Sequence, residues 1–240
     1  MAIVIVLGLM GCTSQSEREL VVSAAASLAD SFATIESAFE RAHPGVDVIV
    51  NLAGSSALRE QVLEGAPVDV FASASLSDMD LLVAAGETAG DPRVFASNLL
   101  QIAVPPGNPA GVAGLGDFAN DDLLIGLCAD GVPCGDFARE VLANAGVVPS
   151  IDTNEGDVRS LLTKIEGGEL DTGIVYVTDV VSSRGAVEGV GIPEDVNVVA
   201  EYPIAVMANG ADPESAAAFI DFVLSDEGQA IMAEFGFSSP

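Results

Sequence analysis

Basic residues are scarce in this sequence. Its 240 residues include 8 Lys and Arg against 36 Asp and Glu, which gives a formal net charge of −28 at pH 7. Nucleic acids are bound through clustered Lys and Arg that neutralise phosphates, and anionic membrane surfaces attract similar clusters. The sequence has no such cluster, so nucleic-acid binding is excluded and binding to an anionic membrane surface is disfavoured. The spread of acidic residues along the chain predicts a solvated acidic surface.

Histidine and tryptophan are also scarce, since His43 is the only histidine and there is no tryptophan. A histidine-based triad, a multi-histidine metal site or a histidine proton relay would depend on His43 alone. This residue precedes Pro44 and Gly45, where we expect a helix to end, so a surface position near a helix C-terminus is the simpler interpretation. Most hydrolase chemistry and a site for a bare metal cation are therefore disfavoured.

The apolar run at the N-terminus is too short to cross a bilayer, because a membrane-spanning helix needs roughly 20 residues. Residues 1–12 (MAIVIVLGLMGC) instead resemble a lipoprotein signal segment, in which Cys12 is lipidated and becomes the mature N-terminus. Residues 13–19 would then form a polar tether. We expect an extracytoplasmic protein, held by lipid on the outer face of the cytoplasmic membrane. The alternative is that the apolar run forms a buried first strand.

Only three cysteines are present. With Cys12 assigned to the lipid, Cys128 and Cys134 remain as an even pair in an exported protein, which favours a disulfide across the turn-rich residues 129–133. Two free thiols are the alternative. The spacing is too wide for a CxxC redox motif, and no further cysteines are available for a zinc site.

Short apolar runs alternate with segments of helical period, and this alternation predicts parallel βαβ units of the α/β class. A Pro-rich break after Val104 and a return near Tyr202 predict two lobes joined by two crossing strands. Lobe I would contain residues 20–102 and 206–240, and lobe II residues 103–205. Strands are expected at 20–24, 46–52, 69–72, 99–104, 123–128, 173–177 and 202–207, with helices at about 27–42, 58–62, 79–85, 135–145 and 157–166 and two within 213–235.

Small polar residues stand where several of these strands pass into helices. Ser27, with Asp30 three residues later, has the pattern of a helix N-cap, and Ser55, Cys134 and Asp157 occupy comparable junctions. A helix N-terminus carries unpaired N–H groups and a partial positive charge, so it can hold an anion without a cationic side chain. One such junction is typical of an ordinary cap, whereas several at equivalent positions fit a cap and an anion site equally well.

A series of motifs across residues 20–237 resembles the periplasmic molybdate-binding proteins of ABC transporters. The resemblance implies a type II periplasmic-binding-protein fold, with two lobes of mostly parallel sheet flanked by helices that close over a tetrahedral oxyanion. The motifs are AAASL at 24–28, GSS at 54–56, GAPVDVFASA at 65–74, VPCG at 132–135, DVR at 157–159, GIVY at 173–176 and FIDFVLSDEGQAIMAEFGF at 219–237.

The resemblance also implies a set of ligand-binding residues. Two serines of lobe I would donate hydroxyl and backbone hydrogen bonds, two residues of lobe II would donate backbone N–H groups, and a tyrosine would donate its phenol. These residues are Ser27 and Ser55, then Cys134 and Val158, then Tyr176.

Two further expectations concern the surroundings of this site. A Cys128–Cys134 disulfide would brace the loop that presents Cys134. Asp69 and Asp157 are expected to support or cap nearby backbone, because a carboxylate facing an oxyanion repels it.

The leading hypothesis is a lipid-anchored, monomeric receptor that captures molybdate or tungstate and delivers it to an ABC permease, with no enzymatic activity and no cofactor. A sulfate-type receptor is the alternative of the same class. An isomerase of a small organic polyacid on the same scaffold would need a general base in the cleft, and no lysine or histidine falls at the junctions. A structural or adhesive surface protein would leave the junction serines without a purpose.

Overall fold

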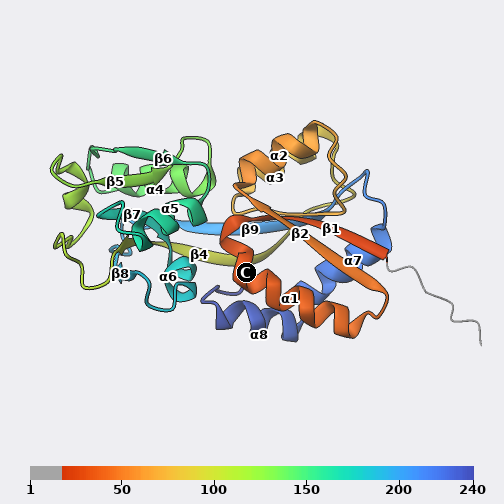
Figure 1. Cartoon of the computed structure of the whole chain (residues 1–240). Helices are drawn as coiled ribbons and strands as arrows, with labels where there is room; N and C mark the ends of the chain where they lie inside the picture. The colour runs from red at the N-terminus through yellow and green to blue at the C-terminus, as the bar shows by residue number, and fades with distance from the viewer. Residues whose placement is uncertain (1–17) are drawn as a thin grey trace, which may run out of the picture.

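The computed structural model describes residues 18–240. The predicted signal segment 1–12, with Cys12, and most of the tether 13–19 lie outside these residues. Two groups of elements stand side by side in Figure 1 and are linked by two long strands. We call them lobe I, which holds β1–β3, and lobe II, which holds β5–β7. The fold agrees with the predicted two-lobe α/β architecture of type II periplasmic binding proteins.

Lobe I is built on a sheet in which β1 pairs in parallel with both β2 and β3. The apolar face of α1 packs on this sheet, and its predicted stripe of Leu28, Phe32, Ile35 and Phe39 is fully buried. The elements of this lobe are β1 (Arg18–Ala25), η1 (Ala26–Leu28), α1 (Ala29–Ala42), β2 (Val46–Ala53), α2 (Ser55–Leu63), β3 (Val70–Ala72), α3 (Leu76–Ala85), α7 (Pro213–Val223) and α8 (Asp226–Glu234).

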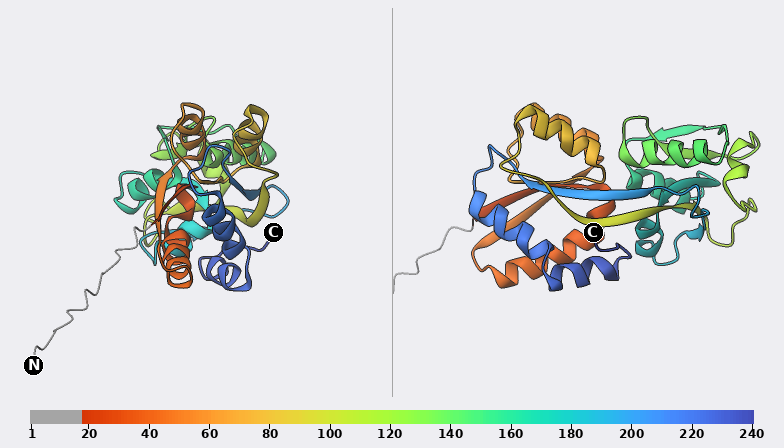
Figure 2. Two further views of the ribbon diagram at one scale, coloured as in Figure 1. Left: turned by 90° about the vertical axis from the view of Figure 1, so that its right-hand side faces the viewer. Right: turned by 180° about the vertical axis from the view of Figure 1, so that it is seen from behind.

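Two strands cross between the lobes, as predicted. β4 (Arg93–Val104) pairs with β9 (Val199–Val206) through Leu99, and from Leu100 onward it pairs with β7 of lobe II. At its other end β9 pairs with β3 of lobe I. All of these pairings are antiparallel, whereas the strands inside each lobe pair in parallel. One continuous sheet, in the order β2-β1-β3-β9-β4-β7-β5-β6, therefore runs through both lobes; the right-hand view of Figure 2 shows the crossing strands.

Lobe II is also built on a parallel sheet, in which β5 pairs with both β6 and β7. Helices α4 and α5 each follow a strand of this sheet and begin at its carboxyl end. The elements are η2 (Leu115–Ala119), β5 (Ile125–Cys128), α4 (Pro133–Asn144), β6 (Thr153–Glu155), α5 (Val158–Glu166), β7 (Thr172–Tyr176), α6 (Val177–Ser182) and β8 (Glu188–Val190).

The sequence-based elements differ from the structure mainly where segments are short. The strand predicted at 99–104 is the second half of β4, which begins at Arg93. β6, β8 and α6 were not predicted, because segments of 3–6 residues carry too little periodicity to detect. No helix within residues 18–240 is long and apolar enough to cross a membrane.

Candidate functional site

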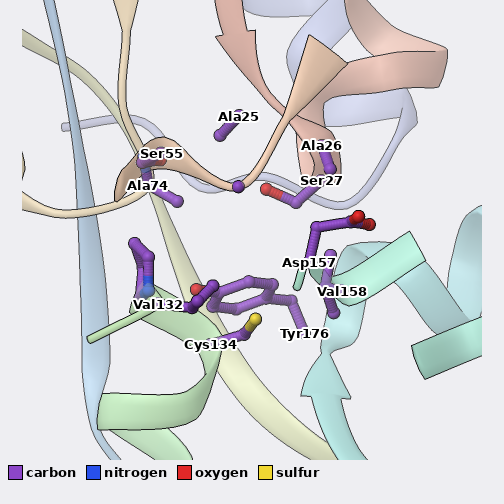
Figure 3. A pocket seen from close by; sticks show the side chains of 12 residues that line it. Ala25, Ala26, Ser27, Ser55, Ala74, Val132, Cys134, Asp157, Val158 and Tyr176 are labelled. Carbon is purple, nitrogen blue, oxygen red and sulfur yellow. The ribbon is translucent and has the colours of Figure 1, made fainter. Parts of the chain in front are cut away.

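The first turns of several helices meet at one small pocket between the lobes. From lobe I come η1 and the start of α2, and from lobe II come the starts of α4 and α5 and the end of β7. All five residues predicted to bind the ligand lie around this pocket (Figure 3). Its lining consists of Ala25, Ala26, Ser27, Gly54, Ser55, Ala74, Val132, Pro133, Cys134, Asp157, Val158 and Tyr176.

Ser55, the first residue of α2, is almost fully buried. Its Oγ accepts a hydrogen bond from the backbone N–H of Ala74 at 3.0 Å. Because that bond uses the oxygen as an acceptor, the hydroxyl proton remains free to be donated. The backbone N–H of Ser55 lies in the first turn of α2, where helix geometry supplies no intrahelical acceptor.

Ser27 does not cap a helix, so that part of the sequence-based prediction was wrong. The residue lies inside the short helix η1, α1 begins only at Ala29, and neither helix has a side-chain cap at its N-terminus. The Oγ of Ser27 instead lies 2.9 Å from the hydroxyl of Tyr202 on β9. A tertiary contact 175 residues away therefore takes the place of the local cap.

Cys134 and Val158 present backbone rather than side-chain chemistry. Cys134 follows Pro133 in the first turn of α4, and Val158 is the first residue of α5. Backbone N–H groups in a first turn have no intrahelical acceptor, and the helix dipole adds partial positive charge there. Both positions are thus suited to hold an anion through main-chain donors, as predicted.

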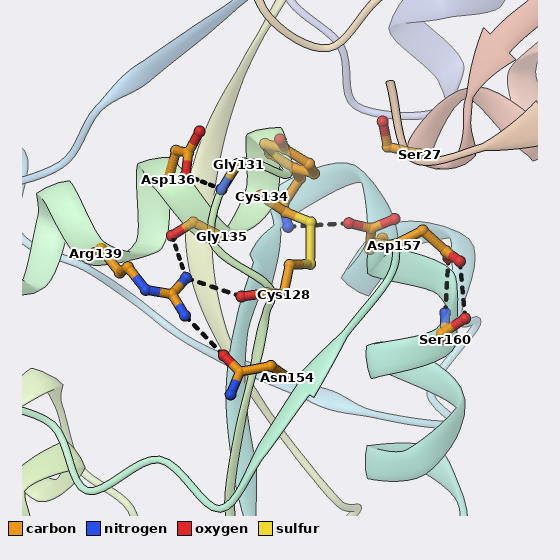
Figure 4. The surroundings of a disulfide bond; sticks show 12 residues. Ser27, Cys128, Gly131, Cys134, Gly135, Asp136, Arg139, Asn154, Asp157 and Ser160 are labelled. Carbon is orange, nitrogen blue, oxygen red and sulfur yellow. Dashed lines mark hydrogen bonds between the residues drawn. A yellow bond between two sulfur atoms is a disulfide. The ribbon is translucent and has the colours of Figure 1, made fainter. Parts of the chain in front are cut away.

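Asp157, the N-cap of α5, uses its carboxylate to cap the helix. One oxygen accepts from the backbone N–H of Ser160 at 2.9 Å and the other from the Ser160 hydroxyl at 2.8 Å (Figure 4). The second carboxylate singled out in the sequence, Asp69, accepts backbone N–H groups of Val21 and Asp212 at 2.8 and 3.0 Å. Both carboxylates support backbone, in agreement with the expectation from sequence.

Tyr176 ends β7 and is fully buried, with its ring in the pocket wall. Among residues 18–240 its hydroxyl oxygen has no hydrogen-bond partner. Burial raises the pKa of Tyr176 well above its usual value, so the phenol stays protonated at any physiological pH. A buried hydroxyl without a partner is costly, and one that faces a pocket is satisfied by a ligand that accepts its proton.

The predicted disulfide between Cys128 and Cys134 is present (Figure 4). It joins the end of β5 to the first turn of α4, across the loop that presents Cys134 to the pocket. The guanidinium of Arg139 ties the same region together by donating to the carbonyls of Cys128 and Gly135 at 2.8 and 2.9 Å. The loop that carries the Cys134 N–H is therefore held at both ends.

The pocket lining contains no lysine or arginine. The nearest cation along the chain, Arg159 on α5, forms an ion pair at 3.0 Å with Asp30 of lobe I, and both side chains are partly exposed. Hydroxyls and backbone N–H groups are thus the hydrogen-bond donors of the pocket.

A family model for bacterial extracellular solute-binding proteins matches residues 20–238. The chain belongs to this family. Membership places it outside the cytoplasm, in line with the expectation from the sequence.

Individual relatives agree with this family assignment. The molybdate-binding protein ModA of Mycobacterium tuberculosis (strain ATCC 25618 / H37Rv) is 36% identical, and the match covers 98% of this chain and 95% of the relative. The solved periplasmic molybdate-binding protein of Azotobacter vinelandii has a TM-score of 0.80 at 19% identity, covering 92% and 99% of the two chains. The sulfate-binding protein SubI of M. tuberculosis H37Rv has a TM-score of 0.82 at 19% identity, covering 92% and 87%. These two structures show a likeness of fold alone.

Membership of the solute-binding family makes this pocket the candidate ligand site. Two contacts around the pocket were not predicted from the sequence. Tyr202 was expected only as part of a strand, although its hydroxyl contacts Ser27. Ala74 was quoted within a motif, but its N–H was not recognised as the group that orients Ser55. Neither carries a local signal, because each contact joins residues far apart in the chain.

Proposed function

We propose that this protein is the molybdate-binding receptor of an ABC transporter and that the pocket between its lobes holds the oxyanion. The observation that carries the proposal is the convergence of uncharged donors from both lobes, with the unpartnered hydroxyl of Tyr176 among them. The 36% identity to a molybdate-binding protein over almost the whole chain supports the same ligand.

The chemistry of the donor set suits a fully ionised oxyanion. Such an anion offers only acceptors, and the pocket offers the hydroxyls of Ser27, Ser55 and Tyr176 together with helix N-termini. The Asp157 carboxylate, which would repel an anion, is bonded to Ser160. A ligand that still carried a proton would have to direct it at a donor, so the site discriminates against protonated species.

The lobes supply different parts of the site, so binding favours their approach. Ser27 and Ser55 belong to lobe I, while Cys134, Val158 and Tyr176 belong to lobe II. An anion that bonds to both sets links the lobes, and the resulting shape is what a permease can distinguish from the empty receptor. Tungstate, with the same tetrahedral arrangement of acceptors, is the second metal oxyanion that we expect to bind.

The finer parts of the proposal concern the location and state of the protein. We propose that Cys12 carries lipid, that residues 13–19 tether the receptor to the outer face of the cytoplasmic membrane, and that it acts as a monomer without cofactor or catalytic activity. The lobe boundaries of 20–102 with 206–240, and 103–205, are part of this proposal.

Sulfate is the one competing ligand that a specific observation favours, because the sulfate-binding protein SubI has the same fold. A polyacid isomerase has less support, since the only carboxylate in the pocket lining, that of Asp157, is engaged in capping α5.

Thermal unfolding of the purified protein with molybdate, tungstate, sulfate, phosphate or citrate tests the proposal. A ligand at about 1,000 times its dissociation constant adds about 4 kcal/mol to stability, which raises Tm by about 8–16 °C in a protein of this size. We expect such a shift with molybdate and tungstate and little shift with the others. A large shift with sulfate alone would favour the sulfate receptor, and one with citrate alone would contradict the oxyanion site.

The variant Tyr176→Phe tests the role of the Tyr176 hydroxyl in the same experiment. It keeps the ring packing and removes only the unpartnered hydroxyl, so we expect the Tm of the free protein to stay the same or rise. Loss of a hydrogen bond to a charged ligand should weaken molybdate binding about 10- to 100-fold. A variant that binds molybdate as tightly as the wild type would contradict the assignment of Tyr176.

A further inference from the structure

A continuous series of side-chain hydrogen bonds runs from Ser27 to lobe II. The Ser27 hydroxyl lies 2.9 Å from that of Tyr202 on β9, and the Asn98 amide on β4 donates to Tyr202 at 3.5 Å. The same amide nitrogen donates to the Thr178 hydroxyl on α6 at 2.8 Å. Tyr202, Asn98 and Thr178 are all buried, so no bulk water competes for these bonds. The series therefore links a predicted ligand residue to both crossing strands.

The order of donors in this series follows from Asn98. Its Oδ1 accepts the backbone N–H of Leu99 at 3.0 Å, so its NH₂ group faces Tyr202 and Thr178. An NH₂ group only donates, and the Tyr202 oxygen therefore acts as acceptor toward Asn98. The only other group that forms a hydrogen bond with the Tyr202 oxygen among residues 18–240 is the Ser27 hydroxyl, so the single proton of Tyr202 is left for the Ser27 oxygen.

The consequence appears at the pocket. Once Ser27 accepts the proton of Tyr202, its own hydroxyl proton is free to point at a ligand. We propose that Tyr202, oriented by Asn98, is a positioning residue that makes Ser27 a hydrogen-bond donor to the bound oxyanion. This inference rests on the proposed function and adds to it the residues that fix the polarity of the site.

Ser55 is also held as a hydrogen-bond donor, but through a different partner. Its oxygen accepts from the backbone N–H of Ala74 rather than from a side chain. Both serines are thus held with their oxygen occupied and their proton available. Burial raises the pKa of Tyr202, so its proton is retained across the physiological range. Since Ser55 has no bond to Tyr202, it is the natural control for Ser27.

The test is a pair of double-mutant cycles, with the molybdate Kd measured by calorimetry. Tyr202→Phe keeps the ring and removes the hydroxyl, and we expect it to weaken binding about 10-fold. In a Ser27→Ala background the same change should weaken binding by less than about 2-fold, because the residue it orients is gone. In a Ser55→Ala background it should again cost about 10-fold.

A further variant separates the hydroxyl from the packing of the ring. Phe237 packs edge-on against Tyr202, with ring centroids 5.3 Å apart. Phe237→Leu should lower the Tm of the free protein but change the molybdate Kd by less than about 2-fold. If it weakened binding as much as Tyr202→Phe, ring packing rather than the hydroxyl would be responsible and the inference would be overturned.

The outcomes also distinguish this inference from the proposed function. An equal effect of Tyr202→Phe in the wild-type and Ser27→Ala backgrounds, with tight molybdate binding by the wild type, overturns the positioning role alone. A wild-type protein that does not bind molybdate overturns the proposed function and this inference with it.

Discussion

At the scale of single residues, the pocket contains hydroxyl groups that can each form one more hydrogen bond. The Ser55 oxygen accepts from the N–H of Ala74, the Ser27 hydroxyl is paired with that of Tyr202, and Tyr176 has a hydroxyl with no protein partner among residues 18–240. Each would be unfavourable in an empty interior, because unsatisfied buried polar groups lower stability. Under the proposed function, this free energy is recovered when an anion accepts these bonds.

Asp179 is another buried residue with an unpartnered polar atom. Its Oδ2 accepts the backbone N–H of Tyr176 at 3.0 Å, and its Oδ1 has no partner in the described part of the chain. Burial raises the pKa of this carboxyl to about 7, with the charges of Asp30 and Asp157 acting in the same direction and the Tyr176 N–H and Arg159 opposing. The carboxyl is thus partly protonated near neutral pH.

The raised pKa predicts a pH-dependent stability. The unfolded pKa is about 3.9, so the folded protein holds this proton more tightly and loses the associated stability as pH rises from about 4 to about 7. Asp179→Asn removes that loss. The Tm of the variant minus that of the wild type should therefore increase between about pH 4 and 7 and then level off, as thermal unfolding at a series of pH values would show. A difference that stays constant across this range would contradict the prediction. Carboxyls elsewhere whose pKa is raised, such as Asp78, are common to both proteins and do not affect this difference.

At the scale of elements, the pocket brings together the starts of several helices in addition to side-chain hydroxyls. The chain supplies cations to none of the pocket positions, and first-turn N–H groups of α2, α4 and α5 take their place. The disulfide and Arg139 hold the start of α4 against the end of β5. In the proposed site, Cys134 acts through its backbone N–H, while its sulfur joins the start of α4 to the end of β5.

These two roles of Cys134 can be separated. Replacing Cys128 and Cys134 together with Ala should reduce the free energy of unfolding by about 2 kcal/mol, since a short cross-linked loop is released in the unfolded chain. This corresponds to a fall in Tm of about 4–8 °C. The rise in Tm on adding molybdate should remain, because the backbone N–H is retained. Its disappearance would show that the bridge is needed to hold the loop for binding.

Gly54 lies at a close contact between the lobes. A Cβ built at this position would lie 2.5 Å from the backbone carbonyl oxygen of Gly156 in lobe II, and backbone cannot move aside as a flexible side chain can. The helix start of α2 therefore approaches α5 only because residue 54 has no side chain.

Gly54→Ala should accordingly hinder the approach of the lobes. We expect the variant to keep the Tm of the free protein within a few degrees, because the added methyl affects an inter-lobe contact rather than the core of either lobe. Its molybdate affinity should fall about 10-fold or more, measured by calorimetry. Gly65→Ala is a suitable comparison for a general effect of Gly replacement: Gly65 has space around it but a positive φ of 89°, so it should lower Tm without changing affinity. Unchanged affinity in Gly54→Ala would contradict the role assigned to this contact.

At the scale of the whole molecule, a chain of net charge −28 is proposed to bind a dianion. The two facts are compatible because they act over different distances. Surface charges are screened beyond about 8 Å at physiological ionic strength, whereas the donors of the pocket act at contact. The net charge slows the encounter with the anion and has much less influence on the bound state.

This separation predicts the effect of salt on binding kinetics. Raising the ionic strength from about 0.01 M to about 1 M shortens the Debye length from about 30 Å to about 3 Å, so repulsion between the protein and molybdate weakens. The association rate measured by stopped flow should therefore rise with added NaCl. A rate that falls steeply would point to an attractive cationic entrance, which none of the pocket-lining residues provides.

The amino-acid sequence alone was enough to predict the fold class, the pairing of two cysteines and five residues that line one pocket. These depend on local patterns: the stripe of Phe32, Ile35 and Phe39, the small residues at strand-to-helix junctions, and ordered motifs that resemble a known family. Only the tertiary structure decided which hydroxyl bonds to which neighbour. It replaced the expected cap at Ser27 with a bond to Tyr202, paired Ser55 with the N–H of Ala74 and left the Tyr176 hydroxyl open. Such contacts join residues brought together by packing of distant strands and helices, and no pattern within a short stretch of sequence encodes them.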